Sequence, residues 1–267
     1  MVTRIAILGG GVMGETLLTT LVAAGQDPAT IAVAEKSGER AEALRTTHGV
    51  EVTDGAAAVK GADLVLLVVK PQDVPQVLAD IAADVSPGAT VASFAAGVRI
   101  AQIEAALAPG TAVIRIMPNT PAVVGEGMFG ASPGSSCSAE DVGTLERLLS
   151  AGGRFIVIDE SLQDALTAVS GSGPAYVFYL AEAMIAGGVE AGLDAETARV
   201  LTTQTILGAA KLLADSDADA AELRRRVTSP NGTTAEAIAT FDERGVKAAI
   251  AAGVQAAARR SAELSGA

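Results

Sequence analysis

A glycine-rich stretch near the start of the sequence constrains the fold of this chain more than any other feature. An apolar run over residues 5–8 is followed by Gly9, Gly11 and Gly14 in the spacing G-x-G-x-x-G, and a helical pattern continues to residue 24. A strand, a glycine turn and a helix in this order are typical of the first βα turn of a dinucleotide-binding fold. Gly9 would allow the tight turn, Gly11 would let the backbone approach a pyrophosphate, and Gly14 would let the helix pack closely on the sheet.

Short apolar strands and helices then alternate along the chain, which predicts a parallel sheet with helices on both faces. After a helix that ends at Leu149 and a last strand at 155–158, every segment beyond Asp159 has a helical pattern. We therefore expect an α/β chain with a Rossmann-like doubly wound sheet over residues 1–159 and an all-α oligomerisation domain over residues 160–267. The earlier strands are expected at 30–34, 49–52, 63–69, 89–93 and 112–117.

Composition excludes several classes of function. The net charge of −12 disfavours binding to a nucleic-acid backbone. Cys137 and His48 are the only cysteine and histidine, which leaves no intramolecular disulfide, no His-rich zinc site and no Cys–His nucleophile; no metal site is predicted. The uncharged stretch 165–181 is broken by glycines and a proline, so it is interpreted as buried core rather than as a membrane span. A soluble, cytoplasmic protein is expected.

The helical half of the sequence is rich in Ala, Leu and Gly. Helices of this kind bury too little surface by themselves, so packing against a second copy is favoured over a self-contained helical domain.

Three predicted strands end at one edge of the sheet, where open α/β sheets bind ligands. Lys70 follows one of these strands, and its ammonium group would face either the ligand or solvent. Ala95 and Ala96 follow the next strand and are small enough to let a nicotinamide ring lie flat. Asn119 follows the third strand, where it could contact the ligand or form an Asx turn.

Glu35 lies 21 residues after Gly14, where an acid would accept a hydrogen bond from the ribose 2′-OH of NAD. Lys36, Ser37 and Arg40 follow it and could instead hold the 2′-phosphate of NADP. Both chemistries are present, so these residues alone leave the choice of cofactor open.

One polar segment stands apart in the helical half. Residues 227–234 form a loop with a glycine that opens a helix, and free N–H groups are expected at Gly232, Thr233 and Thr234. Together with the hydroxyls of Ser229, Thr233 and Thr234, these groups would bind a small carboxylate. Ordinary N-capping by Ser or Thr is the alternative.

Taken together, these motifs resemble the pyrroline-5-carboxylate reductase family, whose members make proline from its cyclic imine. The family signature V-T-S-P-G-G-T-T matches residues 227–234, except that Asn231 replaces a glycine. The family motifs V-K-P, A-A-G, M-P-N-T-P and S-G-S-G-P-A-Y occur here in the same order, at residues 69–71, 95–97, 117–121 and 170–176.

The resemblance implies roles for individual residues. Ser229, Gly232, Thr233 and Thr234 would bind the substrate, and the Thr234 hydroxyl would be the catalytic group that reaches the ring nitrogen. The family usually prefers NADPH; Glu35 departs from its pattern of small polar or basic residues, so NADPH is expected, with NADH as the open alternative. With the arguments above, the predicted cofactor-binding residues are Gly9, Gly11, Val12, Met13, Gly14, Glu35, Lys36, Ser37, Val69, Lys70, Pro71, Ala95, Ala96 and Asn119.

The resemblance also implies 1-pyrroline-5-carboxylate and proline as substrate and product, and dimers that assemble into a decamer. A cyclic imine needs an anion site, a held hydride donor and a proton for its nitrogen, so positioning can supply much of the catalysis without a metal. Two alternatives compete with this reading. A β-hydroxyacid dehydrogenase would need a lysine on the helix after the glycine-rich turn, where residues 175–178 contain none. A non-enzymatic dinucleotide sensor would not need the loop at 229–234.

Overall fold

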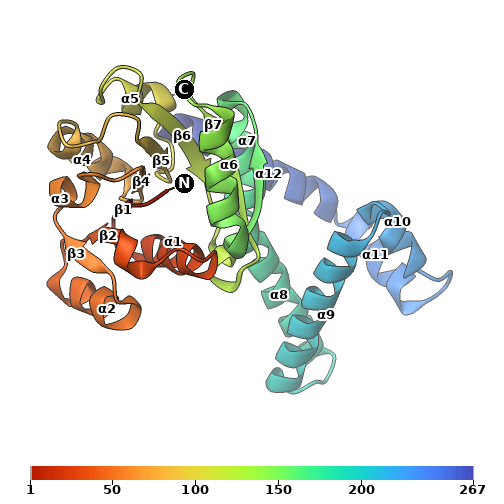
Figure 1. Cartoon of the computed structure of the whole chain (residues 1–267). Coiled ribbons are helices and arrows are strands. Elements are labelled where there is room, and N and C mark those ends of the chain that lie inside the picture. Colours follow the sequence, from red (N-terminus) through yellow and green to blue (C-terminus); the bar gives the residue numbers. More distant parts are fainter. Residues whose placement is uncertain (1, 267) are drawn as a thin grey trace. The chain divides into compact units, whose positions relative to one another are not determined.

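The computed structural model describes residues 2–266, which form two compact units (Figure 1). The first unit, called the sheet unit here, consists of two segments, one that ends at Ser172 and one that begins at Ala257. The second unit, called the helical unit, spans Gly173–Ala256. This division differs from the predicted boundary after Asp159. Residues just beyond 159 belong with the sheet because Gln163, which is fully buried, donates from Nε2 to the Gly130 carbonyl at 3.0 Å.

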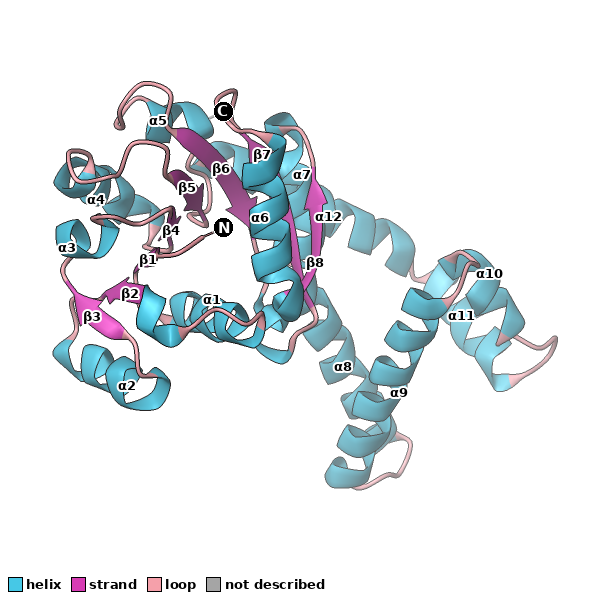
Figure 2. Cartoon of the chain, in the orientation of Figure 1, coloured by secondary structure: helices cyan, strands magenta, loops and turns pink. Residues whose placement is uncertain are grey.

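The sheet of the described residues has eight strands in the order β3-β2-β1-β4-β5-β6-β7-β8 (Figure 2). The strands from β1 to β6 pair in parallel, and the strand order reverses between β1 and β4, which is the ligand-binding switch point of a doubly wound fold. The prediction of a Rossmann-like sheet is confirmed. The strands are β1 (Ile5–Leu8), β2 (Ile31–Ala34), β3 (Glu51–Thr53), β4 (Leu64–Leu67), β5 (Thr90–Ser93), β6 (Ala112–Met117), β7 (Gly127–Pro133) and β8 (Gly153–Val157).

The prediction that the whole sheet is parallel is wrong at β7, a strand that the sequence analysis missed. β7 runs antiparallel to β6 and parallel to β8. Its sequence contains Gly127, Gly130 and Pro133, residues that are depleted in strands and so conceal the strand pattern. A Cβ at Gly130 would overlap the side chain of Leu166, so the glycine that weakens the sequence signal is the residue that lets α7 (Gln163–Leu166) approach the strand.

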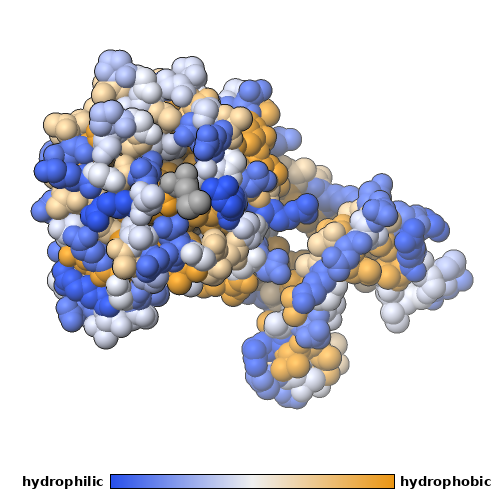
Figure 3. All heavy atoms as spheres, in the orientation of Figure 1, coloured by the Kyte–Doolittle hydropathy of each residue, from blue (hydrophilic) through white to orange (hydrophobic). Residues whose placement is uncertain are grey.

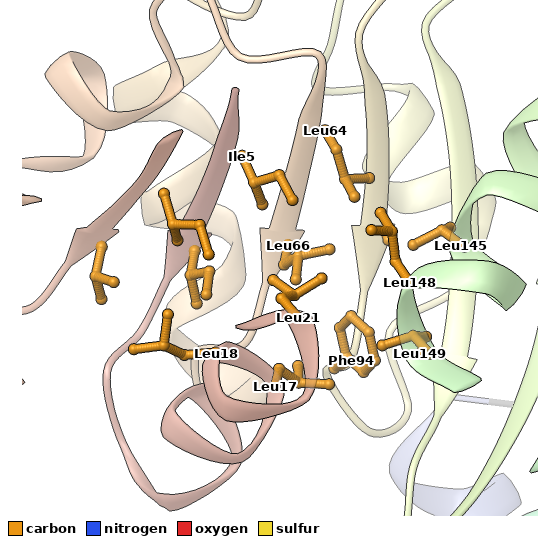
Figure 4. Packing of buried hydrophobic residues seen from close by; sticks show 14 of the residues in the cluster. Ile5, Leu17, Leu18, Leu21, Leu64, Leu66, Phe94, Leu145, Leu148 and Leu149 are labelled. Carbon is orange, nitrogen blue, oxygen red and sulfur yellow. The ribbon is translucent and has the colours of Figure 1, made fainter. Parts of the chain in front are cut away.

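Helices cover both faces of the sheet, as predicted. Ile5 and Ile7 of β1 join one apolar cluster with α1, α2 and α6, whereas Ala6 and Leu8 join the other with α3, α4 and α5; Figure 4 shows the first cluster. This alternation makes β1 apolar along its whole length, as a strand buried on both faces must be. The helices of this unit are α1 (Val12–Ala23), α2 (Gly38–His48), α3 (Gly55–Val59), α4 (Val74–Ile81), α5 (Ile100–Glu104), α6 (Ala139–Leu149) and α7 (Gln163–Leu166), with short turns η1 (Pro28–Thr30), η2 (Pro71–Asp73), η3 (Thr120–Val124), η4 (Ser150–Gly152), η5 (Glu160–Leu162) and a π-helical turn η6 (Thr167–Gly171).

The helical unit contains α8 (Gly173–Glu190), α9 (Ala195–Asp215), α10 (Ala220–Arg226), α11 (Thr233–Glu243) and most of α12 (Val246–Leu264). The last turns of α12 belong to the sheet unit, where Ser261 Oγ donates to Asp164 Oδ1 at 2.6 Å. None of the described helices is long and apolar enough to cross a membrane.

Apolar side chains of the helical unit are exposed on its surface, where they appear orange in Figure 3. The interpretation of residues 165–181 as buried core is wrong within this chain. Val169, Phe178 and Tyr179 are exposed by 65%, 63% and 76%, and α8 has no buried residue. The helices of a single chain offer too little opposing surface to cover these side chains.

Candidate active site

The glycine-rich turn joins β1 to α1 at the switch point of the sheet. Gly9 has a φ of +111°, and a Cβ there would lie 2.9 Å from the Val68 carbonyl oxygen, so the turn requires a glycine. Gly14 is also required, because a Cβ there would overlap the Gly9 carbonyl oxygen. The helix therefore approaches the turn most closely, and it also packs on the sheet as predicted, since the same Cβ would lie 3.7 Å from Ile7 Cγ2 of β1.

Gly11 precedes the first turn of α1 and is exposed, and a Cβ on it would meet nothing within 4 Å. Val12 begins the helix with 77% of its surface exposed, and Met13 packs on the apolar cluster beneath. The first N–H groups of a helix have no intrahelical acceptor. Open space beside Gly11 and these N–H groups together fit the diphosphate of a dinucleotide.

The predicted residues after β4 and β5 gather at the same edge of the sheet. Lys70 is exposed and has no ion-pair partner among the described residues, and Val69 packs against the second apolar cluster. Pro71 and Ala96 line one cleft of about 500 Å³, together with Leu264 from the end of α12. Ala95 next to it is buried. The structure therefore brings the loops after β4 and β5 together, as the sequence predicts.

The carboxylate of Glu35 lies against the glycine-rich turn. Its Oε2 accepts from the Gly10 N–H at 3.0 Å, and its Oε1 accepts from the Ser37 N–H at 2.8 Å. Ser37 in turn caps α2, and its Oγ accepts from the Arg40 N–H at 3.4 Å. Lys36 is exposed and has no ion-pair partner among the described residues.

Arg40 was one of the residues that could hold a 2′-phosphate, but its guanidinium has protein partners. Nε donates to the Gly10 carbonyl oxygen at 2.7 Å, and a terminal nitrogen pairs with Glu15 in the first turn of α1. The other oxygen of Glu15 lies 2.9 Å from His48 Nε2. The hydrogen bond with His48, followed by that with Arg40, holds the pKa of the Glu15 carboxyl below its usual range.

The sequence analysis missed Gly10 and Glu15 as parts of this site and gave His48 no role in it. These residues come together only through tertiary contacts between segments that are 25 to 33 positions apart. The available signal was Gly10 itself, the middle glycine of the run 9–11, where a Cβ would lie 2.6 Å from Leu44 Cδ1.

The side-chain amide of Asn119 joins β7 to the π-helical turn η6. Oδ1 accepts from the Met128 N–H at 2.8 Å, and Nδ2 donates to the carbonyl oxygen and hydroxyl of Ser170 at 3.2 and 3.3 Å. The alternative of an Asx turn is wrong, because Oδ1 bonds to β7 rather than to the residues directly after Asn119. A contact of Asn119 with the cofactor stays a prediction.

The predicted anion loop lies in the helical unit and begins with a tight turn. The Gly232 N–H donates to the Ser229 carbonyl oxygen at 3.1 Å, with Pro230 and Asn231 at the central positions. Asn231 has a φ of +59°, the sign that a type II turn requires at its second central residue. Asparagine tolerates this conformation better than most residues, which explains how it stands where the family has a glycine.

The prediction of a free N–H at Gly232 is wrong, because this group closes the turn. Gly232 is the N-cap of α11 and has no side-chain cap, and the N–H groups of Thr233 and Thr234 have no acceptor among the described residues. A Cβ at Gly232 would lie 2.5 Å from Ser229 Oγ, so the glycine keeps this hydroxyl beside the start of the helix. Ordinary N-capping does not account for the loop, since no hydroxyl caps the helix.

Comparison with known proteins finds two matching family models and full-length relatives. A family model described as pyrroline-5-carboxylate reductase dimerisation matches residues 160–264, and one described as NADP oxidoreductase coenzyme F420-dependent matches residues 4–97. The pyrroline-5-carboxylate reductase of Pseudomonas aeruginosa is 43% identical over 263 residues, which cover 98% of this chain and 96% of that protein.

Solved structures agree with this. A pyrroline-5-carboxylate reductase from Coxiella burnetii is similar with a TM-score of 0.93 at 33% identity, covering 98% of both chains. The pyrroline carboxylate reductase of Plasmodium falciparum with NADP bound is similar with a TM-score of 0.88 at 26% identity, again over 98% of both chains. With these matches over nearly its whole length, the chain belongs to the pyrroline-5-carboxylate reductase family.

Proposed function

We propose that the chain reduces the cyclic imine of 1-pyrroline-5-carboxylate to L-proline, the last step of proline biosynthesis, as an NAD(P)H-dependent oxidoreductase acting on a C–N bond. The observation that carries this proposal is the turn at Ser229–Gly232, which leaves the N–H groups of Thr233 and Thr234 open at the start of α11. Family membership supports the same reaction and favours it over a β-hydroxyacid dehydrogenase.

The substrate is a carboxylate with a ring imine, and the loop offers groups for both parts. The N–H groups of Thr233 and Thr234 and the hydroxyl of Ser229 would hold the carboxylate, aided by the helix dipole. The Thr234 hydroxyl would orient the ring nitrogen and pass it a proton, directly or through water. Protonation leaves the imine carbon electrophilic, and the carbon then gains the hydride as the nitrogen takes up the electron pair of the C=N double bond.

The residues at the glycine-rich turn fit a dinucleotide, which supplies the hydride when it is bound. Gly11 and the first turn of α1 would hold its diphosphate, and Ala95 and Ala96 would lie near its nicotinamide. We propose NADPH as the cofactor, supported by the NADP in the Plasmodium falciparum structure and by the exposed ammonium of Lys36. NADH remains the alternative because the Glu35 carboxylate could accept a hydrogen bond from the ribose 2′-OH of that cofactor. The assay below compares the two cofactors.

The proposal includes dimers formed through the helical unit, five of which join in a decamer. The exposed apolar side chains of α8 and α9 support the dimer. The reaction is placed in the cytoplasm, supported by the single cysteine, which leaves the chain without an intramolecular disulfide.

The experiment is the oxidation of NADPH, then of NADH, by pyrroline-5-carboxylate, followed as the loss of absorbance of the reduced cofactor. We expect turnover by the wild type and a loss in Thr234→Ala of about 1–3 kcal/mol of transition-state stabilisation, the scale of one lost hydrogen bond. Thr240→Ala is the matched control: it lies on the same helix, and its hydroxyl only bonds back to the Glu236 carbonyl oxygen.

The two outcomes separate an enzyme from a sensor. Turnover that falls in Thr234→Ala but not in Thr240→Ala supports the reductase and the role of Thr234. Tight binding of a cofactor by the wild type with no turnover of the imine would instead leave a non-enzymatic dinucleotide sensor.

A further inference from the structure

Gly10, inside the glycine-rich turn, is held on both sides by residues that follow β2. Its N–H donates to Glu35 Oε2 at 3.0 Å, and its carbonyl oxygen accepts from Arg40 Nε at 2.7 Å. A Cβ at Gly10 would lie 2.6 Å from Leu44 Cδ1 and 3.0 Å from Glu35 Oε2, so the turn packs directly on α2. The conformation of the turn is therefore set by these two side chains as well as by its glycines.

Arg40 also joins this turn to the helix that follows it. Its guanidinium pairs with Glu15, whose carboxylate lies in the first turn of α1. That is an unfavourable place for a negative charge if a diphosphate binds at the same helix start, because two anions there repel each other. The side chains of Arg40 and Glu15 are only 32% and 34% exposed, so solvent screens their charges incompletely.

We propose that Arg40 is a positioning residue for the dinucleotide: it fixes the Gly10 carbonyl and neutralises Glu15, and it is not the ligand of the 2′-phosphate. The proposal rests on the proposed function, since it takes the glycine-rich turn as the cofactor site. Both of these effects act at the diphosphate, which NADH and NADPH share. The loss of Arg40 should therefore weaken both cofactors alike, and Lys36 is the cation left for a 2′-phosphate.

The test is direct titration of the full-length protein with NADH and with NADPH, followed by the fluorescence of the reduced nicotinamide. In Arg40→Gln we expect the Kd values of both cofactors to rise by the same factor, about tenfold or more. In Lys36→Gln, the matched control on the same loop, the rise should be confined to NADPH. Arg40→Lys should lose less cofactor affinity than Arg40→Gln, because the lysine ammonium can still reach either the Gly10 carbonyl oxygen or the Glu15 carboxylate.

A double variant gives a readout that a merely structural role of Arg40 would not move. Glu15→Gln combined with Arg40→Gln should bind both cofactors more tightly than Arg40→Gln alone, because it removes the Glu15 carboxylate, which in Arg40→Gln keeps only His48 as a partner beside the diphosphate. Thermal melting of each variant checks that it is folded, and Arg40→Lys carries the comparison if Arg40→Gln does not fold.

Three results would overturn the inference: a loss in Arg40→Gln that is confined to NADPH, a loss for neither cofactor, or no recovery in the double variant. The failure of the proposed function has a different signature, since in that case the wild type binds neither cofactor or does not reduce the imine.

Discussion

The sheet unit buries its apolar side chains within one chain, whereas the helical unit leaves many of them in solvent. Leu18 and Leu66 in the sheet unit are fully buried, but Leu201 and Leu213 on α9 are exposed by 53% and 49%. Burial of apolar surface is the main source of folding free energy. The sheet unit can therefore be stable as part of a single chain, whereas we expect the stability of the helical unit to depend on a second copy.

This difference matters for function because the candidate cofactor-binding residues and the candidate substrate-binding residues lie in different units. The glycine-rich turn lies in the sheet unit, and the loop with Thr234 lies in the helical unit. We therefore expect cofactor binding to depend little on assembly and turnover to depend strongly on it.

The largest expected effect comes from charging the exposed apolar surface of the helical unit. Phe178→Asp combined with Leu201→Asp should prevent self-association, because an unpaired carboxylate in an apolar interface costs several kcal/mol. Sedimentation velocity would show monomers. Arg199→Ala is the control on α9, since it removes only an exposed ion pair with Glu196 and should leave the assembly intact.

A substitution in the core of the sheet unit should behave differently. Leu66→Ala removes a fully buried side chain and should lower the free energy of unfolding by about 2–5 kcal/mol at any protein concentration. Leu213→Ala should instead cause a loss that depends on protein concentration. Denaturant unfolding at two concentrations of each variant checks this; a concentration-dependent loss in Leu66→Ala would remove the distinction between the units.

The stability of the turn before α11 should depend on which residue occupies position 231, where φ is positive. Asn231→Gly should leave stability unchanged or raise it slightly, whereas Asn231→Val should cost about 1–2 kcal/mol because a β-branched residue is strained at a φ of +59°. The strained loop should also raise the KM for the imine. Thermal melting and steady-state kinetics measure the two effects, and equal behaviour of the two variants would contradict the turn geometry.

The smallest expected effect is the pH dependence of the contact between α1 and α2. The pKa of Glu15 is lowered in the folded chain by His48 and Arg40, so its contribution to stability is present above the ordinary glutamate range and is lost as the pH falls through the folded pKa. The difference in melting temperature between wild type and Glu15→Gln should therefore shrink as the pH is lowered through and below the ordinary glutamate range. A difference that stays constant into the acid range would show that the ionised Glu15 carboxylate does not contribute to the stability of the fold.

Local features of the sequence predicted those parts of the molecule that local physics determines. The spacing of Gly9 and Gly14 predicted a turn in which both positions exclude a side chain, and the apolar runs predicted β1 and β4. β7 was missed because it contains Gly130, a residue of low strand propensity that is needed there to leave room for the side chain of Leu166.

Contacts between distant segments could not be predicted in this way. The bonds of Arg40 to Gly10 and Glu15, and those of Asn119 to Met128 and Ser170, depend on how the elements pack. No spacing rule links these residues. The free N–H groups at Thr233 and Thr234 were expected, but the use of the Gly232 N–H in a turn follows only from the backbone path at Asn231.

The most direct measurement is NADPH binding and imine reduction in the same preparation of the Phe178→Asp/Leu201→Asp variant. If the sheet unit binds the cofactor by itself and the helical unit needs a second copy, the monomeric variant will bind NADPH with the wild-type Kd and will not reduce pyrroline-5-carboxylate. Wild-type turnover by a monomer, or the loss of NADPH binding in a folded variant, would contradict this division between the two units.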